Sequence, residues 1–334
     1  MKQKKAKIFV FVCILGLFLC LVGVMIRFYF PLELMELSTR YEYWKSNVHE
    51  IKPSPVNGGL HSWVSDQCDQ GGGSKGGCTC VALVHGLGDN SNTWKKLLIW
   101  PRTDWNSRGF DQPLKLVAVD LPGTGESLPP KESNGTGYRA RKQAERLHES
   151  LKSLSRPQGD CAKWIVVGNS FGGWVALWLS LDWPQDVERL VLLSPAGLKQ
   201  KEIFSNAQTV LSAPTVESLK DFQKRAYAKP REIPEFVWKA LVRRVEKGTT
   251  AQVAQAQTEE DGLDSRLFSI RTPSLMLWGK QDRVLPLSYG YQMRSLMPGG
   301  VLWREVEGCG HLPQKECPQE VVQAIIDMTR FGPM

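Results

Sequence analysis

The stretch "VVGNSFGGW", Val166–Trp174, places a single serine between glycines, after a run of apolar residues and before a helix-like segment. Trp164–Asn169 has the composition of a buried strand, and the apolar residues after Ser170 are typical of a helix. A strand that turns sharply into a helix holds the intervening serine in a strained conformation, with its hydroxyl exposed at the carboxyl end of the strand. Gly168 and Gly172 then have to be small because strand and helix atoms crowd the turn. An ordinary tight turn gives the same local pattern, so the rest of the chain must decide between the two interpretations.

Short apolar runs alternate with helical patterns along the chain, which predicts a mostly parallel sheet covered by helices on both faces. The predicted strands are Cys80–Gly86, Leu114–Asp120, Trp164–Asn169, Arg189–Ser194, Ser274–Gly279 and Val301–Glu307. The predicted helices are Arg139–Leu154, Phe171–Leu181 and Pro318–Arg330. Residues 197–271 have no strong strand signal and predict a helical insertion between two strands of the sheet.

The composition is that of a globular protein, with 334 residues, 42% hydrophobic and 23% charged. The net charge of +8 is concentrated in the N-terminal tail, residues 1–7, and in a basic stretch from Lys220 to Lys247. A solvated helical face explains the second cluster. No basic motif with interleaved aromatic residues is present, so we expect no nucleic-acid partner. An anionic membrane surface fits the basic clusters better.

The run Ile8–Ile26 contains no charged residue and is long enough to cross a hydrocarbon layer of ~30 Å. A signal peptide is the alternative, but its apolar region usually spans about 7–15 residues and ends at a cleavage site of small residues. Here Arg27–Phe30 follows as an interfacial segment. We therefore expect an uncleaved transmembrane anchor over residues 8–30, followed by a polar, partly helical connector over residues 31–55. The lysines of the tail favour an orientation with the globular part outside the cytoplasm.

The eight cysteines leave the redox compartment open. The close pairs Cys68–Cys78 and Cys309–Cys317 could form disulfides in an oxidising compartment, with Cys80 beside the first pair, and free thiols are the alternative. No C-x-x-C pair with a matching second pair exists, so we expect no zinc site.

A serine hydroxyl is a weak nucleophile at neutral pH and needs a base within hydrogen-bond reach. His311 lies in the loop "GCGHLPQKECP" between the last strand and the last helix, which suits the chain order serine, acid, histidine. His85 in "HGLG" is the alternative base, and we expect it to shape its own loop. His148 lies in a helix pattern and is expected at the surface.

The base needs an acid that fixes its tautomer, and Asp282 in "WGKQD" follows a predicted strand at a suitable place. Asp261 and Asp264, in the insertion, are weaker alternatives. The oxyanion that forms during acyl transfer needs pre-placed donors. We expect these to be the backbone N–H groups of Leu87 and Phe171. The loop "VDLPGTGES", residues 119–127, is assigned a structural role at the rim of the site.

These motifs in one order resemble the α/β-hydrolase fold family, from about Leu60 to the C-terminus: HGLG, DLPGTGES, GNSFGG, WGKQD and GCGH. The resemblance implies an α/β core formed by residues 56–196 and 272–334, with a mostly parallel sheet flanked by helices. It also implies that residues 197–271 form a helical cap over the site, and that neither a cofactor nor a metal is needed. Haloalkane dehalogenases and epoxide hydrolases, which share this fold, use Asp where Ser170 stands.

Two branches of the family are most similar. Membrane-anchored monoacylglycerol lipases resemble this chain in "SPAGL", "WGKQDRVL" and the N-terminal anchor. Hydrolases that cleave carbon–carbon bonds in ring-fission products resemble it in "GNSFGG" and "WGKQDRVLPLSYG". The latter usually carry an Asn-bearing stretch after the oxyanion loop and Trp after the catalytic histidine, where this chain has Leu312.

We therefore expect a membrane-anchored serine hydrolase that cleaves carboxylic esters of apolar acyl chains through an acyl-enzyme. Its partners would be a lipid-like or ester small molecule and the membrane. A carbon–carbon bond hydrolase is the first alternative. A non-catalytic binding protein on the same fold is the second, and the filled triad of Ser170, Asp282 and His311 argues against it.

Overall fold

The structure is a computed structural model that describes residue 23 and residues 30–54, 58–68, 78–110, 112–132, 135–155, 161–199 and 212–330. The basic tail and, apart from Gly23 and Phe30, the predicted anchor over residues 8–30 lie outside the described residues. Among the residues that are described, no helix is both long enough and apolar enough to cross a membrane.

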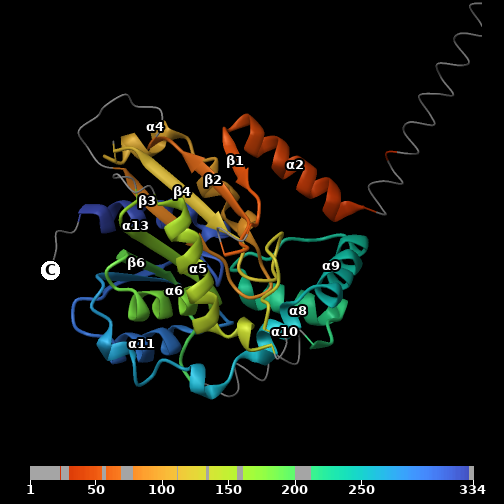
Figure 1. The fold of residues 1–334 in the computed structure, drawn as a ribbon. Helices are drawn as coiled ribbons and strands as arrows, with labels where there is room; N and C mark the ends of the chain where they lie inside the picture. Colours follow the sequence, from red (N-terminus) through yellow and green to blue (C-terminus); the bar gives the residue numbers. More distant parts are fainter. Residues whose placement is uncertain are drawn as a thin grey trace, which may run out of the picture.

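Eight strands form one sheet in the order β1-β2-β4-β3-β5-β6-β7-β8 (Figure 1). Strands β3 to β8 pair in parallel, whereas β1 and β2 are antiparallel additions at the β4 side. All six predicted strands are present, and β1 and β2 are strands that the sequence did not predict. The strands are β1 (Val48–Ile51), β2 (Ser62–Asp66), β3 (Thr79–Val84), β4 (Leu114–Val119), β5 (Trp164–Asn169), β6 (Val187–Leu193), β7 (Ser274–Gly279) and β8 (Leu302–Val306).

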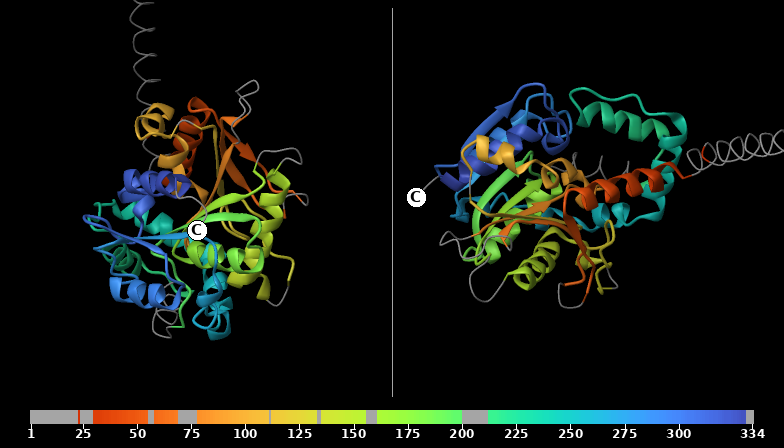
Figure 2. Two further views of the ribbon diagram at one scale, coloured as in Figure 1. Left: turned by 90° about the vertical axis from the view of Figure 1, so that its left-hand side faces the viewer. Right: turned by 90° about the horizontal axis from the view of Figure 1, so that it is seen from above.

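Helices cover both faces of the sheet, so the central strands are buried on two sides (Figures 1 and 2). In β5, Val166 packs into one apolar core while Ile165 and Val167 pack into the other. This two-sided burial explains why the strands read as continuous apolar runs. The first core includes residues of α5 (Ala140–Leu154), α6 (Phe171–Asp182) and α11 (Leu287–Leu296). The second includes residues of α3 (Lys95–Leu98), α4 (Arg102–Ser107) and α13 (Pro318–Arg330).

The insertion between β6 and β7 is helical, as predicted, with no strand among its described residues, 197–199 and 212–271. A capping box starts its first described helix, because the Thr215 hydroxyl accepts from the Ser218 N–H and the Ser218 hydroxyl accepts from the Thr215 N–H. Figure 1 shows the labelled helices of the insertion grouped at one side of the sheet. They are α8 (Val216–Ala226), α9 (Glu235–Lys247) and α10 (Thr250–Ala256). Shorter elements are α12 (Pro313–Glu316) and the 3-10 helices η3 (Ser91–Trp94), η4 (Thr136–Tyr138), η5 (Glu259–Asp261) and η6 (Leu267–Ser269).

The predicted connector contains a complete helix, α2 (Pro31–Lys45), which leads into β1. Tyr43 anchors α2 to the core, since its side chain is fully buried and its ring centroid lies 4.6 Å from that of Trp63 in β2. Glu36 pairs with Arg244 of α9, so the N-terminal half of α2 contacts the helical insertion (Figure 1).

Three disulfides join the six cysteines of the described residues: Cys68–Cys78, Cys80–Cys161 and Cys309–Cys317. The first and third are the two pairs that the sequence analysis named as possible disulfides because they are close in sequence. The second closes a separation of 81 residues and ties the start of β3 to the segment before β5.

Candidate active site

Ser170 occupies the turn between β5 and α6 with φ of 53° and ψ of −116°, a region that side-chain-bearing residues rarely adopt. A Cβ on Gly168 would lie 2.4 Å from the carbonyl oxygen of Gly172. A Cβ on Gly172 would lie 2.4 Å from the carbonyl oxygens of both Val84 and His85. All of these would be backbone clashes that no side-chain movement relieves. The turn is therefore both strained and crowded, as the sequence predicts.

Asp282 and His311 meet at the carboxyl ends of β7 and β8. The Asp282 Oδ2 atom lies 2.8 Å from His311 Nδ1, and both residues are buried. The other carboxylate oxygen accepts hydrogen bonds of 2.9 Å from the N–H groups of Val284 and Leu285. A carboxylate can only accept, so Nδ1 is the donor, and in the neutral imidazole Nε2 then carries the lone pair. That is the tautomer a general base requires.

Asn169 connects the serine turn to the histidine loop. Its side-chain amide donates hydrogen bonds of 3.0 Å to the backbone oxygens of both Leu193 and His311. Gln314 in turn donates to Asn169 Oδ1 at 3.1 Å. The residue directly before Ser170 therefore holds the main chain of His311. Sequence reasoning missed this role because a motif residue gives no sign of a partner 142 positions away.

The loop predicted to form the oxyanion hole runs beside the serine, since a Cβ on Gly86 would lie 3.3 Å from Ser170 Cβ. Leu87 follows in this loop and is half-buried against the core. Phe171 is the first residue of α6, and the N–H groups of a helix's first turn have no intrahelical acceptor. The arrangement keeps the Leu87 and Phe171 amides as the candidate oxyanion donors.

His85 serves its own loop and is not available as a base. Its Nε2 accepts a hydrogen bond of 3.0 Å from the Leu121 N–H, which leaves Nδ1 to donate to the carbonyl oxygen of Gly86 at 2.8 Å. Both ring nitrogens are thus engaged in holding the loop. This agrees with the shaping role expected from the sequence.

The surface position expected for His148 is wrong. The residue is buried, with Nε2 2.7 Å from Asp186 Oδ2 and its ring stacked on Trp183. The polar tip of a histidine can be buried on a helix when a carboxylate and an aromatic face from other segments receive it. Neither partner is visible in the helix pattern itself.

The alternative acids of the insertion are engaged locally. Asp261 Oδ2 accepts from the N–H and the hydroxyl of Thr258, and Asp264 accepts from the Lys199 N–H. The structure pairs His311 with Asp282 and gives neither alternative that position.

A buried ion pair lies beneath the rim loop, residues 119–127. Asp120 accepts from His61 Nδ1 at 2.8 Å, from the Ser91 N–H at 2.6 Å and from the Glu126 N–H at 3.0 Å. Gly125 has φ of +54°, and a Cβ there would lie 2.0 Å from Asp120 Oδ2. The loop is thus wound tightly around one carboxylate, in keeping with the structural role assigned to it.

Burial alone would raise the pKa of Asp120, but hydrogen bonds from His61 and from the Glu126 and Ser91 backbones lower it below its ordinary value. Burial lowers the pKa of His61, and the hydrogen bond and charge of Asp120 outweigh that effect and raise it. The two directions agree, so each partner stabilises the charge of the other. Glu50, His61 and Glu126 also place three potential metal-binding atoms within 4.8 Å of one another, but Arg40 forms ion pairs with both of these carboxylates.

Asp120→Asn should lower the free energy of unfolding at neutral pH by about 2 kcal/mol, the usual scale for hydrogen bonds to a buried charge. Because the pKa of Asp120 is lower in the folded than in the unfolded protein, its contribution is complete above the ordinary carboxyl range and is lost as the pH falls through the folded pKa. Urea unfolding of both proteins, from neutral to acidic pH, should therefore show a difference that shrinks on acidification. Asp221→Asn, at an exposed ion pair, serves as the control and should show little difference at any pH. A constant gap for Asp120→Asn would contradict the assignment.

The histidine loop is tied directly to the helical insertion. The His311 N–H donates to the carbonyl oxygen of Ala226, at the end of α8, at 2.7 Å. Glu316 accepts from the N–H groups of Gly310 at 2.8 Å and of Ala228 at 3.0 Å. Two adjacent contacts thus fix the position of His311 relative to α8.

A second link runs from the histidine loop to the oxyanion loop, where Lys315 Nζ lies 2.6 Å from Asp89 Oδ2. Burial would raise the pKa of Asp89, but the charge of Lys315 lowers it below its ordinary value. Burial would lower the pKa of Lys315, and the Asp89 charge raises it. The ion pair therefore holds the two loops on either side of Ser170 together.

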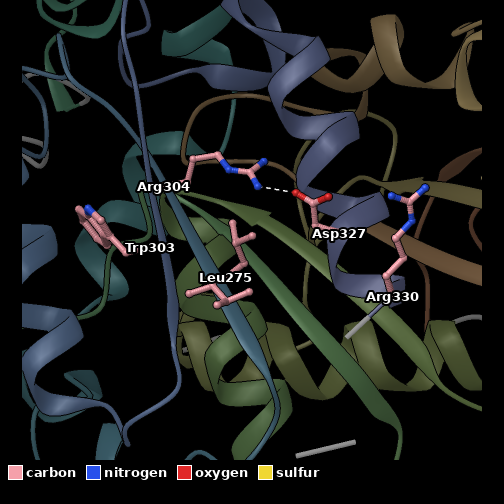
Figure 3. Close-up of a pocket in the computed structure, with 6 residues that line it drawn as sticks. Leu275, Trp303, Arg304, Asp327 and Arg330 are labelled. Carbon is pink, nitrogen blue, oxygen red and sulfur yellow. Dashed lines mark hydrogen bonds and ion pairs between the residues drawn. The ribbon is translucent and has the colours of Figure 1, made fainter. Parts of the chain in front are cut away.

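A cavity of ≈ 350 Å³ lies elsewhere, at the amino end of β7 (Figure 3). Leu275, near the start of β7, lines it, whereas Asp282 follows the opposite end of that strand. Arg304 and Asp327 form an ion pair across its wall. It therefore has no part in the chemistry of Ser170.

Residues 81–324 match the model of a family described as the alpha/beta hydrolase family. The structure is similar to that of a membrane phospholipase A described as a bacterial virulence factor, with a TM-score of 0.68, 25% identity and coverage of 95% of this chain and 97% of that one. It shares its fold with a carboxylesterase of Bacillus subtilis, with a TM-score of 0.64, 21% identity and coverage of 89% and 98%. A 2-hydroxy-6-oxononadienedioate/2-hydroxy-6-oxononatrienedioate hydrolase of Escherichia coli is 25% identical over 265 residues, 74% of this chain and 85% of that protein.

Proposed function

Since this chain belongs to the alpha/beta hydrolase family, we propose that it is a membrane-anchored serine hydrolase of carboxylic esters with apolar acyl chains, such as monoacylglycerols. The observation that supports this most is the buried Asp282–His311 pair, whose loop is bonded to the residue next to a strained serine. Similarity to a membrane phospholipase A and a carboxylesterase favours ester bonds as the target.

The proposed reaction has two halves. The Ser170 hydroxyl attacks the ester carbonyl while His311 Nε2 takes its proton, and the Leu87 and Phe171 amides stabilise the oxyanion. His311 then gives the proton to the departing alcohol, which leaves an acyl-enzyme. A water molecule, deprotonated by the same imidazole, cleaves the acyl-enzyme and restores the serine. Asp282 stabilises the imidazolium in both halves.

We further propose that the uncharged run Ile8–Ile26 anchors the chain with its globular part outside the cytoplasm. The lysines before this run favour that orientation. The disulfides Cys68–Cys78, Cys80–Cys161 and Cys309–Cys317 support it, because such bonds persist in oxidising compartments.

A carbon–carbon bond hydrolase is the second candidate. The match to the Escherichia coli hydrolase covers 74% of this chain and 85% of that protein, whose name specifies 2-hydroxy-6-oxononadienedioate and 2-hydroxy-6-oxononatrienedioate. The same triad could serve that reaction. Leu312, where that branch usually has Trp, favours the ester hydrolase.

The test uses the full chain purified in detergent. A fluorophosphonate probe should label the protein, and peptide mapping should locate the adduct on Ser170. Initial rates are then compared for p-nitrophenyl butyrate, a long-chain monoacylglycerol and a vinylogous 1,5-diketone. We expect both esters to be hydrolysed and the diketone to be left intact. Labelling with turnover of the diketone alone would establish the second candidate, and folded protein without labelling or turnover would indicate a binding protein.

A further inference from the structure

Helix α2 carries a stripe of exposed apolar and aromatic side chains. Their exposed fractions are 54% for Phe30, 37% for Leu34, 63% for Leu37, 62% for Tyr41 and 77% for Trp44. The spacing of three, four and three residues places Leu34, Leu37, Tyr41 and Trp44 on one side of α2, and Phe30 is the N-cap residue directly before the helix. Single exposed apolar residues are common, but a continuous stripe on one helix is a sign of an interaction surface.

The stripe is held in a fixed direction relative to the core. Tyr43, on another side of α2, is fully buried against Trp63. Arg40 forms ion pairs with Glu50 of β1 and with Glu126 of the rim loop. Whatever the stripe contacts therefore sets the orientation of the whole domain.

The position of α2 in the chain indicates its partner. The uncharged run of the predicted anchor ends at Ile26, four residues before the stripe begins. Phe30 has a non-helical backbone, and Pro31 starts α2 as a new helix. The non-helical backbone of Phe30 therefore allows α2 a direction of its own, which a helix along a membrane surface requires.

The side chains themselves suit a bilayer interface. Tyr41 and Trp44, whose ring centroids are 6.0 Å apart, belong to the residue types enriched at the level of lipid headgroups. Helix α9, beside α2, carries the exposed cations Lys239, Arg243 and Lys247, which would attract anionic lipids. A second protein copy would not need this basic flank.

We propose that the stripe Phe30–Leu34–Leu37–Tyr41–Trp44 docks into the headgroup region of an anionic bilayer and holds the helical insertion at the membrane surface. This inference rests on the membrane anchoring proposed above. It adds a second contact, by which the enzyme is oriented as well as tethered.

The direct test measures contact with lipid in the full chain. The protein is reconstituted in vesicles of phosphatidylcholine and phosphatidylglycerol that contain acyl-brominated lipid, which quenches nearby tryptophan. We expect quenching in the wild-type protein and the loss of most of it in Trp44→Phe. Equal quenching in the two proteins would overturn the proposal.

A second test separates docking from chemistry. Leu37→Ser/Tyr41→Ser should hydrolyse vesicle-embedded monoacylglycerol about tenfold more slowly, because contact of the stripe with the interface is lost. Its rate with soluble p-nitrophenyl butyrate should be unchanged. The matched control is Phe268→Ser, because Phe268 is an aromatic residue in η6 that is 61% exposed and lies outside the stripe. This variant should leave both rates unchanged.

The outcomes distinguish this proposal from the proposed function. If neither the wild type nor the variants hydrolyse either ester, the esterase assignment fails, and the lipid quenching still tests the docking proposal. If the double variant keeps its vesicle rate, the docking proposal fails and the esterase stands. If the double variant abolishes a chemically cross-linked dimer in detergent and leaves lipid quenching unchanged, the stripe binds a second copy instead.

Discussion

Asp282→Asn is expected to lower kcat/KM for p-nitrophenyl butyrate by about 10⁴-fold without unfolding the protein. An asparagine side chain keeps the shape and one acceptor oxygen for the Val284 and Leu285 N–H groups. Its NH2 group, however, would face His311 Nδ1, where the carboxylate oxygen now lies at 2.8 Å. A donor at that place forces the proton onto Nε2, and the imidazole can then no longer accept a proton from Ser170.

The two alternative acids provide the controls. Asp264→Asn and Asp261→Asn remove carboxylates whose hydrogen bonds lie within the insertion, so each variant should retain activity close to that of the wild type. Circular dichroism and thermal melting establish that all three variants are folded. If Asp282→Asn retained most of its activity, or if Asp264→Asn lost it, the assignment of the acid would be wrong.

The Cys80→Ala/Cys161→Ala variant is expected to lose about 4.5 kcal/mol of unfolding free energy, because the bond closes a loop with a sequence separation of 81 residues. Loop closure restricts the unfolded chain more strongly as the loop lengthens. The bond also ties β3 to the segment before β5, and β3 and β5 are neighbours in the sheet. Urea unfolding of the oxidised proteins measures the difference.

The Cys309→Ala/Cys317→Ala variant is the comparison, since its separation is only 8 residues and the same relation gives about 2.5 kcal/mol. After reduction, the unfolding free energy of the wild-type protein should be no higher than that of either variant. If reduction left its unfolding curve unchanged, the disulfides would not be present in the purified protein, and the support they give to an oxidising compartment would disappear.

The parts of the fold that the sequence predicted are those with strong local signals. The parallel strands β3 to β7 are mostly apolar and buried, and the turn at Ser170 contains glycines at which a side chain would clash with backbone atoms. β1 and β2 were missed because they are short, contain polar residues such as Glu50 and Ser65, and pair antiparallel at the sheet edge. Such a weak local pattern does not distinguish an edge strand from a connecting segment.

The site shows the same division. Order along the chain was enough to select Asp282 and His311 as partners, and the structure places them together. The contacts of Asn169 with His311, of His61 with Asp120 and of Cys80 with Cys161 join residues 59 to 142 positions apart. No local pattern encodes such pairs. His148 shows the converse error, because a polar residue in a helix suggests exposure until the partners from other segments are known.

The hydrogen bond from the His311 N–H to the Ala226 carbonyl has a kinetic consequence. Because this bond is one of the contacts that position His311, a displacement of α8 would move the main chain that carries the imidazole. A substrate too bulky for α8 to keep this position would still bind, but His311 would no longer be placed to take the proton from Ser170. Discrimination by size would then appear as a reduced kcat rather than as an increased KM.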